Sequence, residues 1–290
     1  NITQPWQLFN LQGALTATAQ IGIKGSLLGF EKTLYSKDFG PFTLATFEYG
    51  ENGFTVSTVF DGPVAGATVF FDANFNGIQD ADEPHTLSKI DGSYQLAIPL
   101  ELYDSDGSGQ IDLSEGQIVL VDGADTDTFQ DQRIPFISSP QWEVASPLTM
   151  LAMKLEQPDP AQVEAQIEQS LGLPSAFKLY EENPLAGIVA GDSNAATVFR
   201  TQAQLQSLLI LGSNSLGAQG DRKPAALALI DELVTRIQAG ESIDLTNEEQ
   251  LKSIIEDAGT ALSATPKDLE MALDELVFVN QEIAKISGTG

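Results

Sequence analysis

The sequence has no cysteine and a single histidine, His85, among its 290 residues. Disulfide bonds are therefore excluded, and cysteine gives no indication of the redox compartment. A zinc site with two or three histidine ligands is excluded as well, and a Ser-His-Asp triad would have to use His85. Because His85 stands beside Pro84 and just after an acidic loop, we expect it to have a solvent-facing or structural role.

Basic residues are scarce: 14 Lys and Arg stand against 41 Asp and Glu, which gives a formal net charge of -27. A polyanion repels phosphate groups, so nucleic acids and anionic membrane surfaces are disfavoured as partners, whereas divalent cations are favoured. No apolar run reaches the roughly 18 residues that span a bilayer. Since no signal peptide is visible and the chain starts with Asn1 rather than Met, we expect a piece of a longer protein.

Features of catalytic sites are also few. No Gly-rich phosphate-binding loop of the usual kinds occurs, and two Trp and five Tyr are few for a cleft that grips sugars. A carboxylate-dependent hydrolase stays open as the least favoured alternative, because acids are plentiful. We therefore expect a protein that is not an enzyme.

Two halves with different patterns predict an α+β fold. The first half alternates with a period near two, most clearly over 17–23, and Gly and Asp clusters separate its runs. The other expected strands are 42–49, 54–60, 67–71, 93–98 and 117–121. After Pro140 the period becomes that of amphipathic helices, which we expect to begin near residues 147, 160, 195, 227, 246 and 265.

The helical half carries two start signals of recognisable type. Thr246 and Glu249 have the spacing of a capping box, and Thr265, Pro266 and Asp268 are expected to open the last helix. We expect three segments: a β-rich segment over 1–60, a β-sandwich-like domain with calcium loops over 61–140, and an all-α helical domain over 141–290. The β half and the helical half are expected to pack separately, with 132–146 as their junction.

The acidic residues concentrate in the middle of the chain. Between Asp72 and Asp131 there are 14 acids and one base, Lys89. Folding such a segment without counter-ions would bring carboxylates together at a cost that grows as they approach. Two twelve-residue loops inside this segment have the spacing of a calcium-binding loop.

The first loop runs from Asp72 to Glu83. Oxygen-bearing side chains fall at loop positions 1, 3, 5, 9 and 12, which are Asp72, Asn74, Asn76, Asp80 and Glu83. Gly77 stands at position 6, where the backbone turns sharply, and Ile78 at position 7 would contribute its backbone carbonyl.

The second loop runs from Asp104 to Glu115 and meets the same requirements. The matching residues are Asp104, Asp106, Ser108, Gln110 at position 7, Asp112 and Glu115, with Gly109 at position 6 and Ile111 at position 8. Calcium takes six to eight oxygens, and the closing Glu can bind through both of its oxygens. The two loops therefore predict two or more Ca²⁺ ions, against the alternative of two polar turns with solvated acids.

The surroundings of the loops favour a structural role over calcium sensing. Each loop follows a segment that is expected to be extended, 69–71 for the first and 95–103 for the second. Asp91 could reach back to the first calcium, and this stays open. A further acidic cluster, Asp122, Asp125 and Asp127, is interpreted as a solvated turn rather than as the completion of a site.

The segment Asp61-Gly-Pro-Val-Ala-Gly-Ala-Thr-Val-Phe-Phe-Asp72, the first loop and Asp91-Gly-Ser-Tyr-Gln-Leu96 together resemble a known kind of module. They are similar to the calcium-binding B-type repeats of staphylococcal Sdr adhesins and, more loosely, to carboxypeptidase-regulatory or transthyretin-like β-sandwiches. The resemblance implies calcium at Asp72, Asn74, Asn76, Asp80 and Glu83. The Asp91-Gly-Ser-Tyr94 stretch is one residue shorter than the pattern of those modules.

A second resemblance lies in the helical half. Ser146-Pro-Leu-Thr-Met-Leu151, Glu164-Ala-Gln-Ile-Glu-Gln-Ser-Leu-Gly-Leu173 and Asn183-Pro-Leu-Ala186 are similar to a helical region that follows such β-modules in very large bacterial surface proteins. Many of those proteins come from marine bacteria and cyanobacteria, and they are regarded as adhesins or extracellular scaffolds.

These features predict a non-catalytic, calcium-stabilised structural or adhesive module of a large extracellular or cell-surface bacterial protein. Its expected partners are neighbouring domains of the same protein or copies of itself. The alternative is a recognition module that binds a glycan or protein ligand through the β-domain loops, with Trp6 and Trp142 as candidates for stacking. Exposed, coplanar aromatic side chains would favour glycan binding, and their burial would favour a scaffold.

Overall fold

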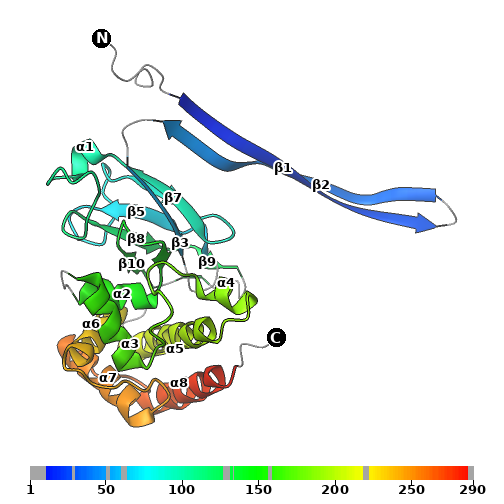
Figure 1. Cartoon of the computed structure of the whole chain (residues 1–290). Coiled ribbons are helices and arrows are strands. Elements are labelled where there is room, and N and C mark those ends of the chain that lie inside the picture. Colours follow the sequence, from blue (N-terminus) through cyan, green and yellow to red (C-terminus); the bar gives the residue numbers. More distant parts are fainter. Residues whose placement is uncertain are drawn as a thin grey trace. The chain divides into compact units, whose positions relative to one another are not determined.

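The computed structural model describes residues 11–27, 30–49, 53–59, 64–126, 131–132, 134–155, 159–217 and 222–286, with side chains from residue 64 onward. The described residues form a mixed α+β protein, as the two sequence patterns predict (Figure 1). By its internal contacts the chain divides into two compact units, residues 1–52 and residues 53–290.

The first unit contains an antiparallel hairpin of two long strands, β1 (Leu11–Leu27) and β2 (Phe30–Tyr49). The register places Leu11 opposite Tyr49 and Leu27 opposite Phe30, with shifts that mark bulges or irregularities along the ribbon. The strands expected over 17–23 and 42–49 lie within it. The hairpin extends further because backbone pairing continues through the polar stretch 31–38, where no apolar alternation signals a strand.

The second unit begins with three small sheets. The first has the order β10 (Phe136–Ser138), β8 (Gln117–Val121), β5 (Thr68–Asp72) and β6 (His85–Leu87). The second has the order β11 (Val144–Ala145), β3 (Gly53–Val59) and β7 (Ser93–Ile98), and β4 (Val64–Ala65) pairs with β9 (Ala124–Asp125). The strands expected over 93–98 and 117–121 are confirmed as β7 and β8.

The segment before the second loop differs from the expectation. Strand β7 ends at Ile98, and Leu100–Tyr103 forms one helical turn, α1, instead of continuing as a strand. Pro99 stands at the N-cap of this turn, and Leu and Glu, which favour helices, occupy its first positions. The second loop therefore follows a helical turn, whereas the first follows strand β5.

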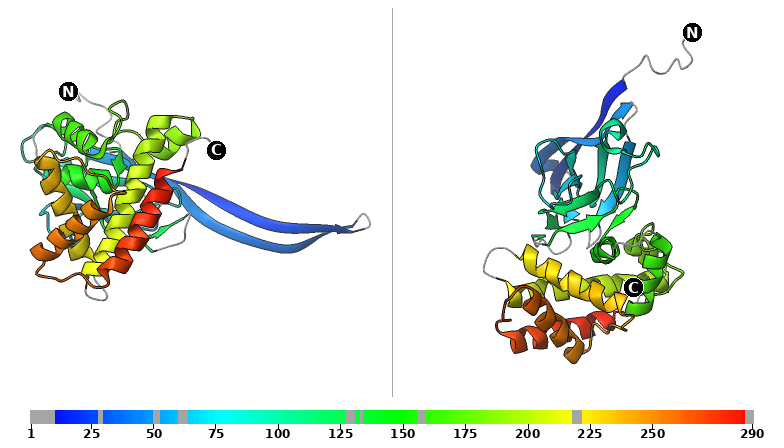
Figure 2. Two further views of the ribbon diagram at one scale, coloured as in Figure 1. Left: turned by 90° about the horizontal axis from the view of Figure 1, so that it is seen from below. Right: turned by 90° about the vertical axis from the view of Figure 1, so that its left-hand side faces the viewer.

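Seven longer helices complete the described part of the chain. They are α2 (Pro147–Lys154), α3 (Pro160–Leu171), α4 (Pro184–Val189), α5 (Ser193–Leu216), α6 (Lys223–Gln238), α7 (Glu248–Ala261) and α8 (Leu269–Ala284). Helices α2, α3 and α4 each start with proline after a capping side chain, from Ser146, Asp159 and Asn183 respectively. Figure 2 shows α5 and α8 side by side, where Gln204 of α5 donates a hydrogen bond to the carbonyl of Asn280.

Neither of the two start signals noted in the sequence, at Thr246 and at Thr265, marks the first residue of its helix. Helix α7 is capped by Asn247, one residue after Thr246, and the hydroxyl of Thr246 instead bonds to Asp244 at 2.6 Å. Asn is as good an N-cap as Thr or better, so the start moves by one residue. Helix α8 begins at Leu269, because Lys267 is tied to Ser215 by two hydrogen bonds that hold the preceding segment against the end of α5.

One hydrophobic core runs through the second unit, from Val64 in the β part to Leu276 in α8. Helix α2 joins the two parts: Leu148 and Leu151 are fully buried, and the hydroxyl of Thr149 donates to the carbonyl of Ile137 in β10 at 3.1 Å. This arrangement differs from the separate packing that the change of pattern near Pro140 suggests, because the junction itself is part of the core.

Candidate metal centres

The first loop begins at the C-terminal end of strand β5, an inner strand of its sheet. Val69, Phe70 and Phe71 are buried, and the strand ends at Asp72, whose side chain is also fully buried. The closing residue Glu83 is only 5% exposed and directly precedes Pro84 and strand β6. Both ends of the first loop are therefore fixed in the fold, and the residues between them reach the surface.

The second loop lies between α1 and β8 and is more open to solvent. Its first and last acids, Asp104 and Glu115, are half-buried, and Asp106 is exposed. Ile111 at loop position 8 is 6% exposed and belongs to the hydrophobic core, so one apolar side chain anchors the loop.

The two loops share the hydrogen bonds made by the acid at position 1. The carboxylate of Asp72 accepts from the backbone N–H of Asn76 at 3.1 Å and of Gly77 at 2.7 Å. At the same two positions of the second loop, Ser108 and Gly109 donate to Asp104 at 3.0 and 2.8 Å. In each loop the backbone thus turns around the first carboxylate.

The closing glutamates repeat this correspondence. Glu83 accepts from the N–H of position 2, Ala73, at 3.0 Å and of position 9, Asp80, at 2.9 Å. Glu115 accepts from the same positions, Ser105 and Asp112, the latter at 3.1 Å. Each glutamate therefore ties the start of its loop to the end through both oxygens.

The side chains at positions 3 and 5 differ in type but accept corresponding hydrogen bonds in the two loops. Asn74 and Asp106 each accept from the N–H of position 5, at 3.0 and 2.8 Å. The oxygens of Asn76 and Ser108 accept from the N–H of position 7, at 2.6 and 3.3 Å. Six hydrogen bonds thus recur in the two loops, and four of them are accepted by the Asp at position 1 or the Glu at position 12, which both loops have.

The backbone follows the same course in both loops. Position 4 has a positive φ, 60° at Phe75 and 72° at Gly107, and so does position 6, 67° at Gly77 and 84° at Gly109. Glycine adopts this region at little cost, whereas a bulky side chain is strained there. Three of the four positions are glycine, and Phe75 is the exception.

The two loops differ in how closely their carboxylate oxygens lie to one another. Carboxylate oxygens of Asp104, Asp106 and Glu115 all lie within 4.8 Å of one another. In the first loop the amide groups of Asn74 and Asn76 donate to one oxygen of Asp80, at 2.8 and 3.0 Å. Hard oxygen donors on alternate residues fit calcium in both loops, and the second has the more compact carboxylate cluster.

Hydrogen bonds favour the ionised form of two acids of the second loop, Glu115 and Asp112. Desolvation acts to raise the pKa of Glu115, but the hydroxyl of Ser105 and three backbone N–H groups outweigh it, and the pKa is lowered. The pKa of Asp112 is lowered mainly by hydrogen bonds from Ser114. Carboxylates, rather than neutral acids, are the form in which these groups could ligate a cation.

The neighbouring acids have local partners. Asp91 is exposed, and it accepts from the N–H and the hydroxyl of Ser93 at 3.0 and 2.7 Å, so its hydrogen bonds are local and do not reach the first loop. Asp122 is exposed with a φ of 61°, and Asp125 pairs with Val64 in the sheet. Asp127 lies outside the described residues.

Two contacts to the first loop come from distant residues that the sequence did not reveal. The amide of Gln117 in β8 donates to the buried carboxylate of Asp72 at 2.8 Å, and the ammonium of Lys223 in α6 donates to the carbonyl of Gly77. The partners are 45 and 146 residues apart, and no local pattern could have indicated them.

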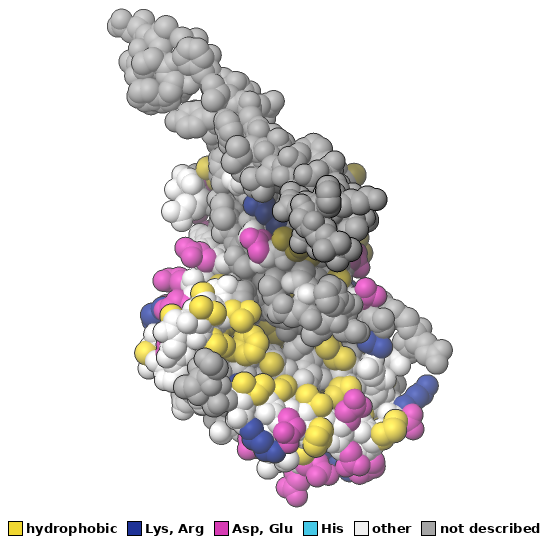
Figure 3. All heavy atoms as spheres, turned by 90° about the vertical axis from the view of Figure 1, so that its right-hand side faces the viewer, with side chains coloured by type: hydrophobic (Ala, Val, Ile, Leu, Met, Phe, Trp, Pro, Cys, Tyr) yellow, Lys and Arg dark blue, Asp and Glu magenta, His cyan; other side chains and the backbone are white. Residues whose placement is uncertain are grey.

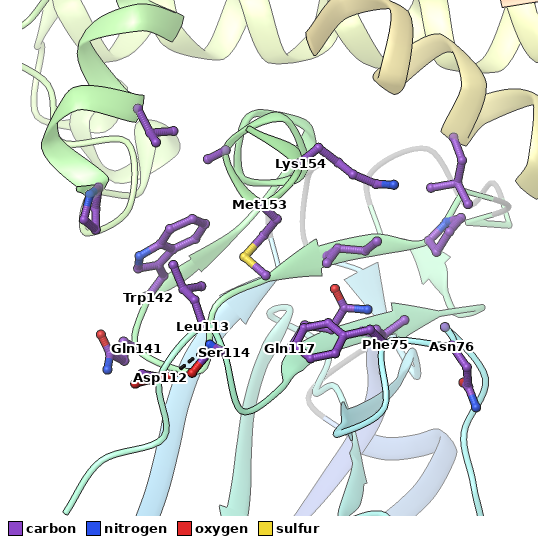
Figure 4. Close-up of a pocket in the computed structure, with 18 of the residues that line it drawn as sticks. Phe75, Asn76, Asp112, Leu113, Ser114, Gln117, Gln141, Trp142, Met153 and Lys154 are labelled. Carbon is purple, nitrogen blue, oxygen red and sulfur yellow. Dashed lines mark hydrogen bonds between the residues drawn. The ribbon is translucent and has the colours of Figure 1, made fainter. Parts of the chain in front are cut away.

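A pocket of about 1000 Å³ lies beside both loops and is also lined by β8, α2, α3 and α6. Figure 4 shows Phe75 and Gln117 at one end of it, and Trp142, Leu113 and Met153 at the other. The contributing loop residues are positions 4 to 6 of the first loop and 9 to 11 of the second.

Trp142, one of the two residues proposed for sugar stacking, does not meet the criterion of exposure. Trp142 is 8% exposed and stacks on Tyr180, with ring centroids 4.2 Å apart and planes 9° from parallel. Burial raises the pKa of Tyr180, in line with its place in the core. Trp6 lies outside the described residues. His85 is exposed, and its Nδ1 lies 3.2 Å from the carbonyl of Glu83.

Comparisons with protein-family models, with curated proteins and with solved structures found no match to this chain. Among the described residues, no helix has both the length and the apolar character needed to cross a membrane.

Proposed function

We propose that this chain is a non-catalytic, calcium-stabilised structural or adhesive module of a large extracellular bacterial surface protein. The observation that carries the proposal is the correspondence between the two acidic loops, which share six internal hydrogen bonds and two left-handed positions. Both loops have Asp at positions 1 and 9, Gly at position 6 and Glu at position 12, and this shared course places oxygen-bearing side chains around one centre in each loop, as a calcium ion needs.

The residues that would hold calcium come from alternate positions of each loop. In the first loop they are Asp72, Asn74, Asn76, the carbonyl of Ile78, Asp80 and Glu83, with Asp91 as an additional candidate. In the second they are Asp104, Asp106, Ser108, the carbonyl of Gln110, Asp112 and Glu115. A bound ion would supply positive charge to clustered carboxylates and so reduce their mutual repulsion.

The attachment of the loops to the core supports a structural role. Asp72 is fully buried and bonded to Gln117 of β8, and Ile111 of the second loop lies in the core. Ordering either loop would therefore stabilise the sheet β10-β8-β5-β6. As part of this proposal, that sheet and β11-β3-β7 are the two layers of a β-sandwich.

The acidic surface of the chain also agrees with an extracellular medium that is rich in calcium. Figure 3 shows acidic and hydrophobic side chains spread over the described part of one face, with fewer basic ones. Sites on extracellular modules bind calcium with dissociation constants of about 0.1 to 1 mM, so calcium outside a cell would fill them. The partners proposed are neighbouring domains of the same protein or further copies, in line with the resemblance to adhesin modules.

The test is thermal unfolding of the whole chain in calcium and in a chelator, with magnesium as the comparison. Filling one site to a hundred times its dissociation constant adds about 2.7 kcal/mol, so the Tm should rise by several degrees in calcium. Magnesium should do little, because it demands stricter octahedral geometry. Equal Tm values in calcium and chelator would contradict the proposal.

A further inference from the structure

The long hairpin of β1 and β2 (Figure 1) has its apolar and its polar residues on opposite faces. Directly opposite residues of an antiparallel pair lie on the same face, and successive residues of a strand alternate between the faces. The register places Ala17 and its partner Phe42 on one face, and Thr16 and its partner Thr43 on the other.

The apolar face continues over the whole length of the hairpin. Seven of its nine β1 residues are Leu, Ile or Ala, and seven of their nine β2 partners are Phe, Tyr or Ala. The remaining four are two glycines and two lysines, Lys32 and Lys37. Among the strands that the structure describes, β1 and β2 pair with each other alone. Because a two-stranded hairpin is marginally stable in water and an apolar area of this length is unfavourable there, this face calls for a partner.

The hairpin also carries no net charge. Residues 11–49 contain three Lys and three Asp or Glu, whereas the whole chain has a formal net charge of -27. Two copies of so acidic a chain repel each other wherever their acidic parts approach. At the hairpin, two copies can meet through apolar residues without adding to that repulsion.

The size of the apolar face fits a pair of hairpins. At about 3.4 Å per residue, the 17 residues of β1 extend over about 55 Å. Since neighbouring strands lie about 4.8 Å apart, the face covers about 500 Å². Two such faces together would bury about 1000 Å², which reaches the size of a specific protein–protein interface.

We propose that this face binds the same face of a second copy of the chain, so that two hairpins pack as the layers of a small sandwich. The closed end of each hairpin lies over the open end of the other, related by a two-fold axis. Lys32 and Lys37 belong to the half near the closed end, so this arrangement keeps the lysines of the two copies apart. The inference rests on the part of the proposed function that names further copies as partners, and calcium takes no part in it.

The first test is the oligomeric state of the whole chain, measured by sedimentation over a range of concentrations. The unmodified chain should form a dimer. Phe39→Glu with Phe42→Glu adds two charges to the apolar face and should weaken the dimer about a hundredfold or more. Ser36→Glu with Thr43→Glu adds the same charges to the same strand on the polar face, and it should leave the dimer unchanged.

The second test reports how the two copies are oriented, since the chain has no cysteine of its own. Leu11→Cys and Leu27→Cys stand on the apolar face at its open and closed ends, about 55 Å apart. A short bismaleimide should join these two variants to each other in a mixture and should join neither to itself. Gln12→Cys and Ser26→Cys, at the same ends of the polar face, are the controls and should give little cross-linking in any combination.

The proposal is overturned if the unmodified chain is a monomer at every concentration, if the two pairs of Glu substitutions weaken the dimer alike, or if each apolar-face cysteine variant cross-links to itself as readily as to the other. Sedimentation in calcium and in chelator keeps this inference apart from the calcium sites. A dimer in both media with a Tm that calcium does not change would remove the calcium proposal alone, and a monomer stabilised by calcium would remove the hairpin proposal alone.

Discussion

Gly123 occupies a position where a side chain would collide with the backbone. An added Cβ would lie 2.7 Å from the nitrogen of Ala67 and 2.9 Å from the carbonyl oxygen of Ala65, and the φ of Gly123 is +83°. We expect Gly123→Ala to lower the free energy of unfolding by more than about 2 kcal/mol, from strain and collision together.

Gly240 offers the matched control, because its φ is +72° and nothing lies within 4 Å of an added Cβ. Gly240→Ala should cost only the left-handed strain, about 1 kcal/mol. Urea denaturation of both variants measures the difference. Equal losses would mean that the close approach to Ala65 and Ala67 carries no cost.

Glu115 tests the second loop at the level of one side chain. Its carboxylate is one of three whose oxygens lie within 4.8 Å, and replacing it by Gln keeps its size while removing the charge. We expect Glu115→Gln to lower the Tm somewhat in chelator, because the amide keeps only one of the two acceptor oxygens, and in addition to abolish much of the rise in Tm that calcium gives. Glu143→Gln, at an exposed residue outside both loops, should behave as the parent does. A loss of equal size in calcium and in chelator would indicate a purely structural role for Glu115.

Helices α6 and α7 are joined by Arg236, whose side chain is 14% exposed. Its guanidinium contacts Glu232 and Asp257, each at 2.7 Å, and also the hydroxyl of Ser253 at 2.8 Å. Lysine keeps the charge but cannot make this forked set of bonds, so Arg236→Lys should destabilise the chain by about 1–2 kcal/mol. Chemical denaturation gives the value.

The control at this scale is Lys252, which pairs with Glu270 at 3.0 Å on exposed side chains. Solvent screens such surface pairs, which therefore contribute little to stability, so Lys252→Met should have a smaller effect than Arg236→Lys. If the two changes cost the same, the Arg236 network would count as an ordinary surface pair.

Some helices and strands could be predicted from local sequence patterns, and others could not because they depend on distant contacts. Strands β7 and β8 and the start of α2 and α3 follow from alternation or from a cap followed by proline, and all of these signals lie within a few neighbouring residues. The start of α8 depends on Lys267 being tied to Ser215, 52 residues earlier, and the sequence does not display that contact. The turn α1 was missed because four residues are too few to show a helical period.

Some features of the two candidate calcium loops could likewise be predicted from the sequence, and others could not. Their side chains, the glycines at position 6 and the closing glutamates were readable from spacing, since a calcium loop is local in the sequence. Gln117, Lys223 and the pocket were not, because they depend on how distant elements pack.

For the molecule as a whole, the shared core predicts how it unfolds. Residues 53–290 form one compact unit by their contacts, and α2 packs its buried leucines at the junction with β10. We expect a chain of residues 53–290 to fold by itself and to unfold in one cooperative transition in differential scanning calorimetry.

Residues 141–290 alone provide the comparison. Without β8 and β10 the buried face of α2 would be exposed, so this shorter chain should lose the cooperative transition or show it at a markedly lower temperature. Two well-separated transitions in the 53–290 chain, one of which is reproduced by 141–290, would mean that the helical half is an independent domain.

The hydrogen bond from Lys223 to Gly77 also sets an order of events during folding. The bonds inside the first loop join residues at most ten positions apart, whereas this contact closes over 146 residues. Local bonds form early, and distant ones wait until the chain between them is ordered. On a ribosome, the first loop would be complete long before α6 exists, so it would take its final contacts only after the helical part had been synthesised.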